Sequence, residues 1–156
     1  MRRGAPLTTY LGWLYEKSKQ FYVETLGFEV IAETFRDERN SYKLDLKVGK
    51  HDPIELFSFP SPPDRPSHPE ACGLRHLAFA VEDIEKAVTE LQLKGVAVKA
   101  VRIDHLTEKQ FTFFQEPDGL PLEISDVRKA VFPRSATLRS CRSQSSLFLY
   151  HVLVVI

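Results

Sequence analysis

The stretch Phe111–Ile124, FTFFQEPDGLPLEI, has the pattern of two strands joined by a tight turn. The segments Gln110–Gln115 and Leu120–Ser125 are rich in apolar and aromatic side chains, as half-buried strands are. Between them, Pro117-Asp118-Gly119 supplies the residue types that tight turns favour. The sequence therefore predicts a β-hairpin here.

The segment before this hairpin predicts a further strand, a helix and another strand. Leu74–Val81 reads as a strand, and Asp83 is placed to cap a helix. The helix carries apolar residues at the i, i+3, i+4, i+7 spacing of an amphipathic helix, and a strand is expected around Val96–Ile103. Together with the hairpin, these elements make a βαβββ unit.

The first half of the chain predicts the same order of elements. Tyr15–Leu26 reads as a helix that Gly27 ends. Three strands are then expected at Phe28–Ile31, Tyr42–Val48 and Ile54–Phe59.

The two halves match at a constant offset, which indicates a duplication. LGFEV at 26–30 corresponds to KGVAV at 94–98, and PIEL at 53–56 corresponds to PLEI at 121–124, both 68 residues apart. The helix starts align at an offset of 69, so a one-residue indel is expected inside the helix. The predicted fold is an α+β domain of two βαβββ modules.

The first strand of the first module is the weak point of this repeat. By comparison with Leu74–Val81 it falls on RRGAPLTTY at 2–10, a poor central strand that contains Pro6. The counterpart of His76 is expected at Leu7 or Thr8, and no histidine occurs before His51. This strand is therefore expected to be missing or altered.

The domain boundaries follow from proline and charge. A chain of 156 residues is long enough for one core, so residues 1–126 are predicted to form a single domain. Its modules span about 7–60 and 73–126, joined by a linker at 60–72 that is rich in proline. Residues 127–156 form an atypical tail without acidic residues.

Composition favours small-molecule chemistry. The 21 basic and 21 acidic residues cancel, so we expect no nucleic-acid partner and no membrane partner. Cys72 and Cys141 fit no disulfide framework, and no apolar run approaches the roughly 18 residues of a membrane span. A cytoplasmic location is expected.

Three residues are candidates for holding a metal ion: Glu55, His76 and Glu123. The two glutamates occupy the same place in each repeat, so they are expected to face each other, and paired buried carboxylates require a positive charge. His76 shares a strand face with apolar residues. Two carboxylates and one imidazole suit a divalent first-row metal. The alternative is that both glutamates face solvent and His76 is a core residue.

Three segments carry a resemblance to a known family: IELFSFP at 54–60, GLRHLAFAVED at 73–83 and the hairpin at 111–124. They resemble the glyoxalase I, bleomycin-resistance and extradiol-dioxygenase (vicinal oxygen chelate) superfamily. The resemblance runs from about Tyr15 to Ser125. The chain is most similar in pattern to small proteins of the lactoylglutathione-lyase type.

This resemblance implies that the two modules form a curved mixed sheet around a metal cleft. It also implies a divalent metal such as Ni or Zn and a homodimer. Four ligands are expected in glyoxalase I relatives, of which three map onto Glu55, His76 and Glu123 and the first-strand ligand has no counterpart. The resemblance implies a lyase or isomerase that uses metal-assisted proton transfer on a small carbonyl or thiol-adduct substrate. Glu123 is the expected base, and Glu55 is the second candidate.

Other readings stay open at this stage. The protein is alternatively a non-catalytic ligand-binding or antibiotic-binding protein of bleomycin-resistance type, or a degenerate member with an incomplete metal site. The apolar tail at 147–156 needs a partner surface. One hypothesis places it in the position of the missing strand, with His151 as the absent ligand; another is that both chain ends derive from frame-shifted coding sequence.

Overall fold

The computed structural model describes residues 7–10, 15–49, 53–63, 65, 69, 72–126 and 152–155. The first module contains β1 (Leu7–Tyr10), α1 (Tyr15–Gln20), the π-helical turn η1 (Phe21–Thr25), β2 (Glu29–Arg36), the 3₁₀ turn η2 (Asp37–Arg39), β3 (Ser41–Lys47) and β4 (Pro53–Phe57). The second contains β5 (His76–Val81), α2 (Ile84–Leu93), β6 (Arg102–Ile103), β7 (Gln110–Gln115) and β8 (Pro121–Asp126). β9 (Val152–Val155) follows.

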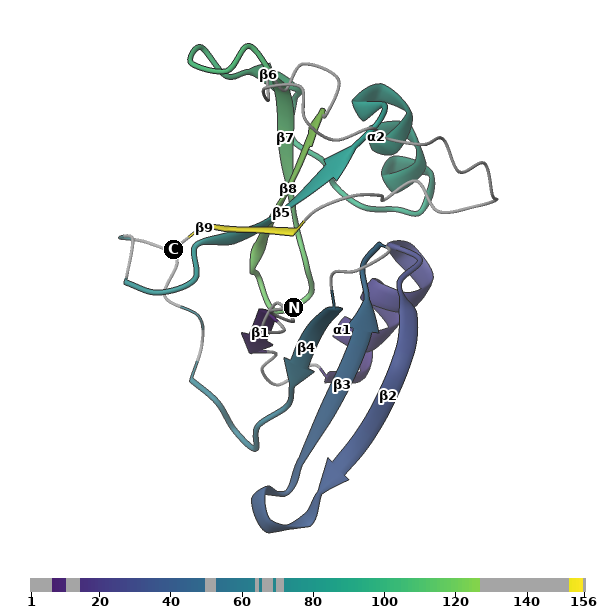
Figure 1. Cartoon of the computed structure of the whole chain (residues 1–156), viewed down its shortest axis with the longest axis vertical. Coiled ribbons are helices and arrows are strands. Elements are labelled where there is room, and N and C mark those ends of the chain that lie inside the picture. Colours follow the sequence, from purple (N-terminus) through teal and green to yellow (C-terminus); the bar gives the residue numbers. More distant parts are fainter. Residues whose placement is uncertain are drawn as a thin grey trace, which may run out of the picture.

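Each module has its own sheet (Figure 1). The strand orders are β1-β4-β3-β2 and β6-β7-β8-β5-β9. In both modules the first strand runs parallel to the last, β1 beside β4 and β5 beside β8, and the remaining pairs within each module are antiparallel. The predicted α+β fold of two βαβββ modules is confirmed, whereas the division into one domain and a tail stays a prediction.

The two helices bury equivalent positions. In α2 the Asp83 carboxylate accepts a hydrogen bond from the Lys86 backbone N–H at 3.1 Å, which caps the first turn as predicted. At the offset of 69 residues, three positions of the first helix match three of α2, and all six side chains are buried. They are Tyr15 with Ile84, Ser18 with Ala87, and Tyr22 with Leu91.

The first helix widens in its second half. The Leu26 N–H donates to the carbonyl of Phe21 over 3.0 Å, a bond five residues long that defines the π turn. Such a turn holds more residues than an α turn, so it absorbs the extra residue that the repeat comparison predicts. Gly27, with φ +77°, then ends the helix.

One apolar core joins the modules. It combines the inward faces of β3 and β4 with those of β5 and β8 and the buried sides of the helices. Aromatic contacts cross between the modules, with ring centroids 5.5 Å apart for Phe28 and Phe79 and 6.3 Å apart for Phe21 and Phe114. Burial of this apolar surface is the main stabilising term for such a domain.

The first strand of module one was expected to be missing or altered, and it is present in altered form as the four residues of β1, against six in β5. Its register places Thr8 opposite Glu55, whereas in module two Ala78 is opposite Glu123. Leu7 and Thr8 are thus the counterparts of Leu77 and Ala78, and neither is the counterpart of His76 as expected. Counting back along the chain from this register gives position 6. Residue 6 is a proline, which offers no side-chain metal ligand, and it lies outside the described residues.

The strand expected at Val96–Ile103 is shortened to the two residues of β6. Val96 and Val98 pack against the core instead. The Lys99 N–H still donates to the Phe113 carbonyl over 2.9 Å. Core packing of the two valines thus outweighs continuous strand pairing at this sheet edge.

The tail strand does not take the place predicted by the tail hypothesis. β9 pairs antiparallel with β5 of the second module, with Val155 opposite His76 and Val152 opposite Phe79. It extends the second sheet and leaves the position beside β4 to β1 (Figure 1). His151 lies outside the described residues.

Candidate functional site

His76 and Glu123 meet on the second sheet. β5 and β8 are parallel neighbours, and the His76 Nε2 lies 3.1 Å from the Glu123 Oε2. The ring of Phe113 packs edge-on against the imidazole with centroids 5.2 Å apart, and Phe113 is opposite Glu123 in the β7–β8 register. Both polar side chains are largely buried, with about 17% and 21% of their surface exposed.

Burial shifts both groups toward their neutral forms. It lowers the pKa of His76, and the charge of Arg75 adds to that effect. Burial also raises the pKa of Glu123, with a further increase from Asp104 and opposing contributions from Arg102 and Lys109. The 3.1 Å contact is therefore made by a neutral imidazole. A neutral imidazole has a nitrogen lone pair that can bind a metal.

Glu55 has a different partner. The Lys43 Nζ lies 2.8 Å from Glu55 Oε1 and 2.5 Å from Asp45 Oδ1. Burial acts to lower the pKa of Lys43, but the two carboxylates outweigh it and the pKa is raised. A protein ammonium group thus supplies the positive charge that the sequence argument assigned to a metal.

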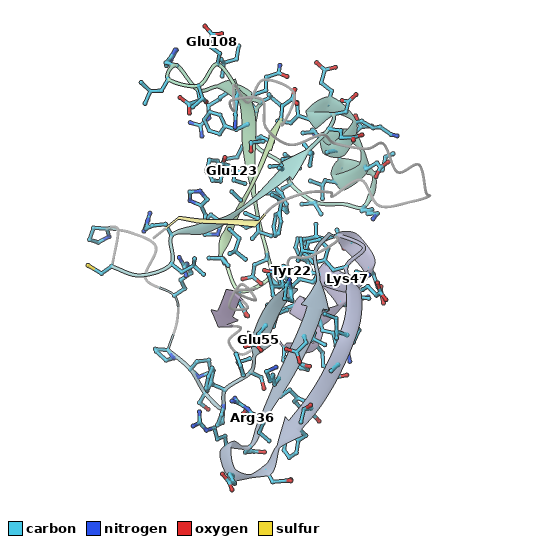
Figure 2. The ribbon with its side chains drawn as sticks, in the orientation of Figure 1. Tyr22, Arg36, Lys47, Glu55, Glu108 and Glu123 are labelled. Carbon is cyan, nitrogen blue, oxygen red and sulfur yellow. The ribbon has the colours of Figure 1, made fainter. Side chains whose placement is uncertain are left out.

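The structure does not bring Glu55 to the His76–Glu123 pair. Figure 2 shows Glu55 on the lower module and Glu123 on the upper one. Among the residues that the structure describes, no group of three His, Cys, Asp or Glu side chains is close enough to hold a metal ion. The expectation that the two glutamates face each other is not met within one chain, and the three-residue ligand set stays a prediction.

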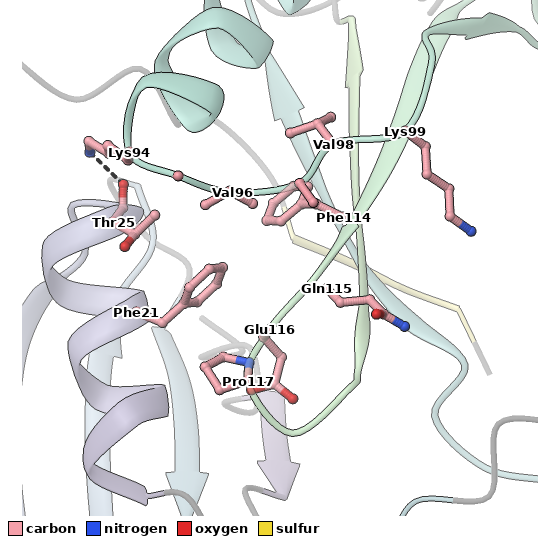
Figure 3. A pocket seen from close by; sticks show the side chains of 12 residues that line it. Phe21, Thr25, Lys94, Val96, Val98, Lys99, Phe114, Gln115, Glu116 and Pro117 are labelled. Carbon is pink, nitrogen blue, oxygen red and sulfur yellow. Dashed lines mark hydrogen bonds between the residues drawn. The ribbon is translucent and has the colours of Figure 1, made fainter.

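Besides the shared core, the modules also meet at the first helix and the β7–β8 turn. A cleft of about 720 Å³ lies there, with Phe21 on one side and Phe114, Val96 and Val98 on the other (Figure 3). At its rim the Lys94 Nζ donates to the carbonyl of Thr25 over 2.5 Å. Neither His76 nor Glu123 lines this cleft, so it is an intermodule joint rather than the place of the candidate chemistry.

A polar cluster that sequence reasoning missed is buried at the same joint. The Ser18 hydroxyl lies within hydrogen-bonding distance of Glu116 Oε2 (3.2 Å) and Asp118 Oδ2 (3.3 Å). The Leu120 N–H donates to Glu116 Oε1 over 3.0 Å. Burial raises the pKa of Glu116 to about 7. The one available signal was that Glu116 aligns, at the offset of 68, with Val48 of the first module.

Arg102 was also missed. Its guanidinium carbon lies 4.9 Å from the ring centroid of Phe111 and 5.9 Å from that of Phe113. The alternating aromatic residues of β7 were visible in the sequence, but the pairing of β6 with β7 that places Arg102 over them was not.

In the part of the chain that the structure describes, no helix is long and apolar enough to cross a membrane.

The comparison with known families agrees with this geometry. The family model of the glyoxalase/bleomycin resistance protein/dioxygenase superfamily matches residues 14–124. The chain belongs to this superfamily. The superfamily resemblance noted in the sequence is therefore confirmed.

Relatives place the chain among small members of the superfamily. The uncharacterized protein YwkD of Bacillus subtilis (strain 168) is 61% identical over 110 residues, which cover 70% of this chain and 86% of YwkD. The crystal structure of a glyoxalase family protein from Enterococcus faecalis is 46% identical with a TM-score of 0.70, covering 80% of this chain and 96% of that one. Glyoxalase I from Zea mays, at 18% identity and a TM-score of 0.63 over 77% of this chain and 43% of that one, shares the fold.

Proposed function

We propose that the protein is a glyoxalase-like metal-dependent lyase or isomerase that acts on a small carbonyl compound. The observation that carries the proposal is the His76 imidazole held 3.1 Å from the Glu123 carboxylate on adjacent strands. An imidazole and a carboxylate suit a divalent first-row cation such as Ni²⁺ or Zn²⁺. When bound, such an ion would act as a Lewis acid on a substrate carbonyl.

Glu123 is proposed as the proton acceptor. Burial raises its pKa, and a carboxylate with a raised pKa is a stronger base near neutral pH. His76 fixes the position of the carboxylate through their contact. Glu55 stays the second candidate for this role.

We propose that Glu55 reaches the site from a second copy of the chain, in a homodimer. Glu55 and Glu123 occupy equivalent strands of two duplicated modules, yet they lie on separate sheets in one chain. A two-fold dimer that sets the first sheet of one copy against the second sheet of the other would unite them at two sites. The Lys43–Glu55 contact would loosen there, since a cation would take over the role of the lysine.

The first experiment is a calorimetric titration of Ni²⁺ and Zn²⁺ into metal-stripped protein. We expect about one ion to bind per chain. His76→Ala and Glu123→Ala should each reduce the affinity for the ion at least ~10-fold, because each removes a side chain proposed to bind it. Glu29→Gln is the matched control, because it removes a largely exposed carboxylate paired with Lys47 on the other sheet. Equal metal binding by all four proteins would overturn the proposal.

Catalysis is tested separately by proton exchange. Carbonyl probes such as methylglyoxal, with and without glutathione, are incubated with Ni-loaded protein in D₂O and followed by NMR. Exchange at the carbon beside the carbonyl that depends on Glu123 supports the lyase or isomerase.

One observation favours a second candidate function, that of a non-catalytic small-ligand or antibiotic-binding protein. Leu7 and Thr8 are the counterparts of Leu77 and Ala78, and by sequence count the position that corresponds to His76 is a proline, so the first module would lack the ligand proposed for this position in the second. Binding without turnover needs no complete metal site. Ligand binding by metal-stripped protein, without any exchange in the NMR assay, would select this function.

A further inference from the structure

Arg102 is fixed on an aromatic wall of the second sheet. It is opposite Phe111 in the β6–β7 register, and its guanidinium carbon lies 4.9 Å from the Phe111 ring and 5.9 Å from the Phe113 ring. The two rings meet edge to face, with centroids 5.9 Å apart. Cation–π stacking on two rings restricts where an otherwise flexible guanidinium can lie.

The same wall borders the His76–Glu123 pair. Phe113 contacts both Arg102 and the His76 imidazole, and it is opposite Glu123 in the β7–β8 register. The guanidinium and the imidazole therefore share one aromatic neighbour. All of these side chains lie on one face of the second sheet, because they occupy paired or alternate positions of neighbouring strands.

The polar atoms of Arg102 are uncommitted within the described part of the chain, where the structure records no hydrogen bond or ion pair for them. Arg36 offers a contrast: it stacks on Phe57 at 4.5 Å, but its Nη2 donates to the Ser41 hydroxyl over 2.7 Å. Both arginines are stacked on aromatic rings, but of the two only Arg102 keeps all of its guanidinium N–H donors available. A guanidinium fork of this kind matches a carboxylate or a phosphate with two parallel hydrogen bonds.

We propose that Arg102, with Phe111 and Phe113, forms a subsite for an anionic group of the substrate, a carboxylate or a phosphate, next to the His76–Glu123 pair, with which it shares Phe113. This inference rests on the proposed function, whose carbonyl site it extends. The substrate class is then a small carbonyl compound that carries a second, anionic group. Neutral carbonyl compounds of the same length would bind more weakly, since the fork would have no partner.

The test compares matched probes that differ in the anionic group. 4-Oxopentanoate is set against pentan-2-one for a carboxylate, and dihydroxyacetone phosphate against dihydroxyacetone for a phosphate, by calorimetry on Ni-loaded protein. The wild type is expected to prefer the anionic member of one pair by at least ~10-fold, the size of a charge-assisted hydrogen-bonded pair. The pair that shows the preference identifies the anion.

Three variants separate the bidentate guanidinium contact from general positive charge. Arg102→Gln is expected to reduce the preference to below ~2-fold, and Arg102→Lys to leave only part of it, since an ammonium cannot make the bidentate contact. Lys109→Gln, which removes another cation near Glu123, should keep the preference. Nickel should still bind to Arg102→Gln at about one ion per chain, because Arg102 supplies no ligand atom, although the loss of its charge near Glu123 changes the affinity.

The outcomes distinguish the two proposals. If nickel does not bind, the metal proposal fails, and the same probe ratios are then measured on the metal-free protein. A wild-type preference below ~2-fold for both pairs, or an unchanged preference in Arg102→Gln, overturns the anion subsite. A preference lost equally in Lys109→Gln would show general charge attraction and would also overturn it.

Discussion

Glu116 shows how one residue can make stability depend on pH. It occupies a position equivalent to Val48 and is about 3% exposed, so a carboxyl group sits where the repeat otherwise has an apolar side chain. Hydrogen bonds from Ser18 and Leu120 compensate it only in part, and its pKa rises from the ordinary 4.5 to about 7. The folded state therefore favours the neutral acid.

Glu116→Gln is predicted to remove this pH dependence. With a raised folded-state pKa, the contribution of Glu116 is full below about pH 4.5, falls as the pH rises to about 7, and is lost above it. From pH 5 to pH 8 the wild type should lose about 1–3 kcal/mol of unfolding free energy relative to Glu116→Gln. Urea denaturation at both pH values measures the difference, and Glu29→Gln is the exposed control. A gap between wild type and Glu116→Gln that is the same at both pH values would contradict the prediction.

Single residues of the candidate site were predictable to the extent that the repeat constrains them. His76 and Glu123 come together as expected, because neighbouring parallel strands fix their distance. Glu55 was placed on the correct strand but not with its partner, since Lys43 and the relation between modules depend on tertiary contacts. Arg102 depends on strand pairing that no local pattern encodes.

At the scale of elements, each of the two helices is followed by a glycine with a positive φ angle. Gly27 and Gly95 are equivalent at the offset of 68, and both adopt positive φ, +77° and +81°. A Cβ built at either position meets no atom within 4 Å. Any penalty for a side chain there is therefore conformational rather than steric.

Gly27→Ala and Gly95→Ala are each predicted to destabilise the fold by about 1–2 kcal/mol, the cost of a left-handed conformation for a residue with a Cβ. Thermal unfolding should shift by roughly 2–8 °C for each variant, given the usual slope for a chain of this size. Gly27→Asn serves as the control, because asparagine tolerates this region better and should lose less. If alanine and asparagine cost the same, or neither costs anything, the backbone explanation is wrong.

Element types were predictable where local patterns agree with tertiary packing. The alternation in the hairpin and the spacing of the second helix gave both elements nearly to the residue. The one-residue indel was detected, but its form as a π turn required the backbone hydrogen bonds. Val96–Ile103 failed as a full strand because packing of Val96 and Val98 against the core competes with pairing at a sheet edge.

At the scale of the whole molecule, the fold was predictable because both halves of the sequence carry the same order of elements. The relation between the modules was not, since it depends on contacts such as Ser18–Glu116, between residues 98 apart in the chain. These contacts join the first helix to the β7–β8 turn and leave Glu55 and Glu123 on separate halves (Figure 2). Under the proposed homodimer, each half of the candidate site would be completed by a sheet of the second copy.

Mixing two variants that each lack one proposed metal ligand tests whether Glu55 and Glu123 of one site come from two different chains. Glu55→Gln and Glu123→Gln should each bind little metal alone. Unfolding and refolding them together at equal amounts should restore about one quarter of the wild-type sites, because half of the dimers are mixed and each mixed dimer holds one intact site. Calorimetric titration of Ni²⁺ gives the site number, and light scattering gives the mass of the assembly. Refolding each variant alone is the control. If the ligands came from one chain, every site in the mixture would carry one substitution and no binding would return. A mixture that binds no more metal than its two components do separately would therefore exclude the shared site. The His76–Glu123 pair within each wild-type chain would then remain as the smaller metal site.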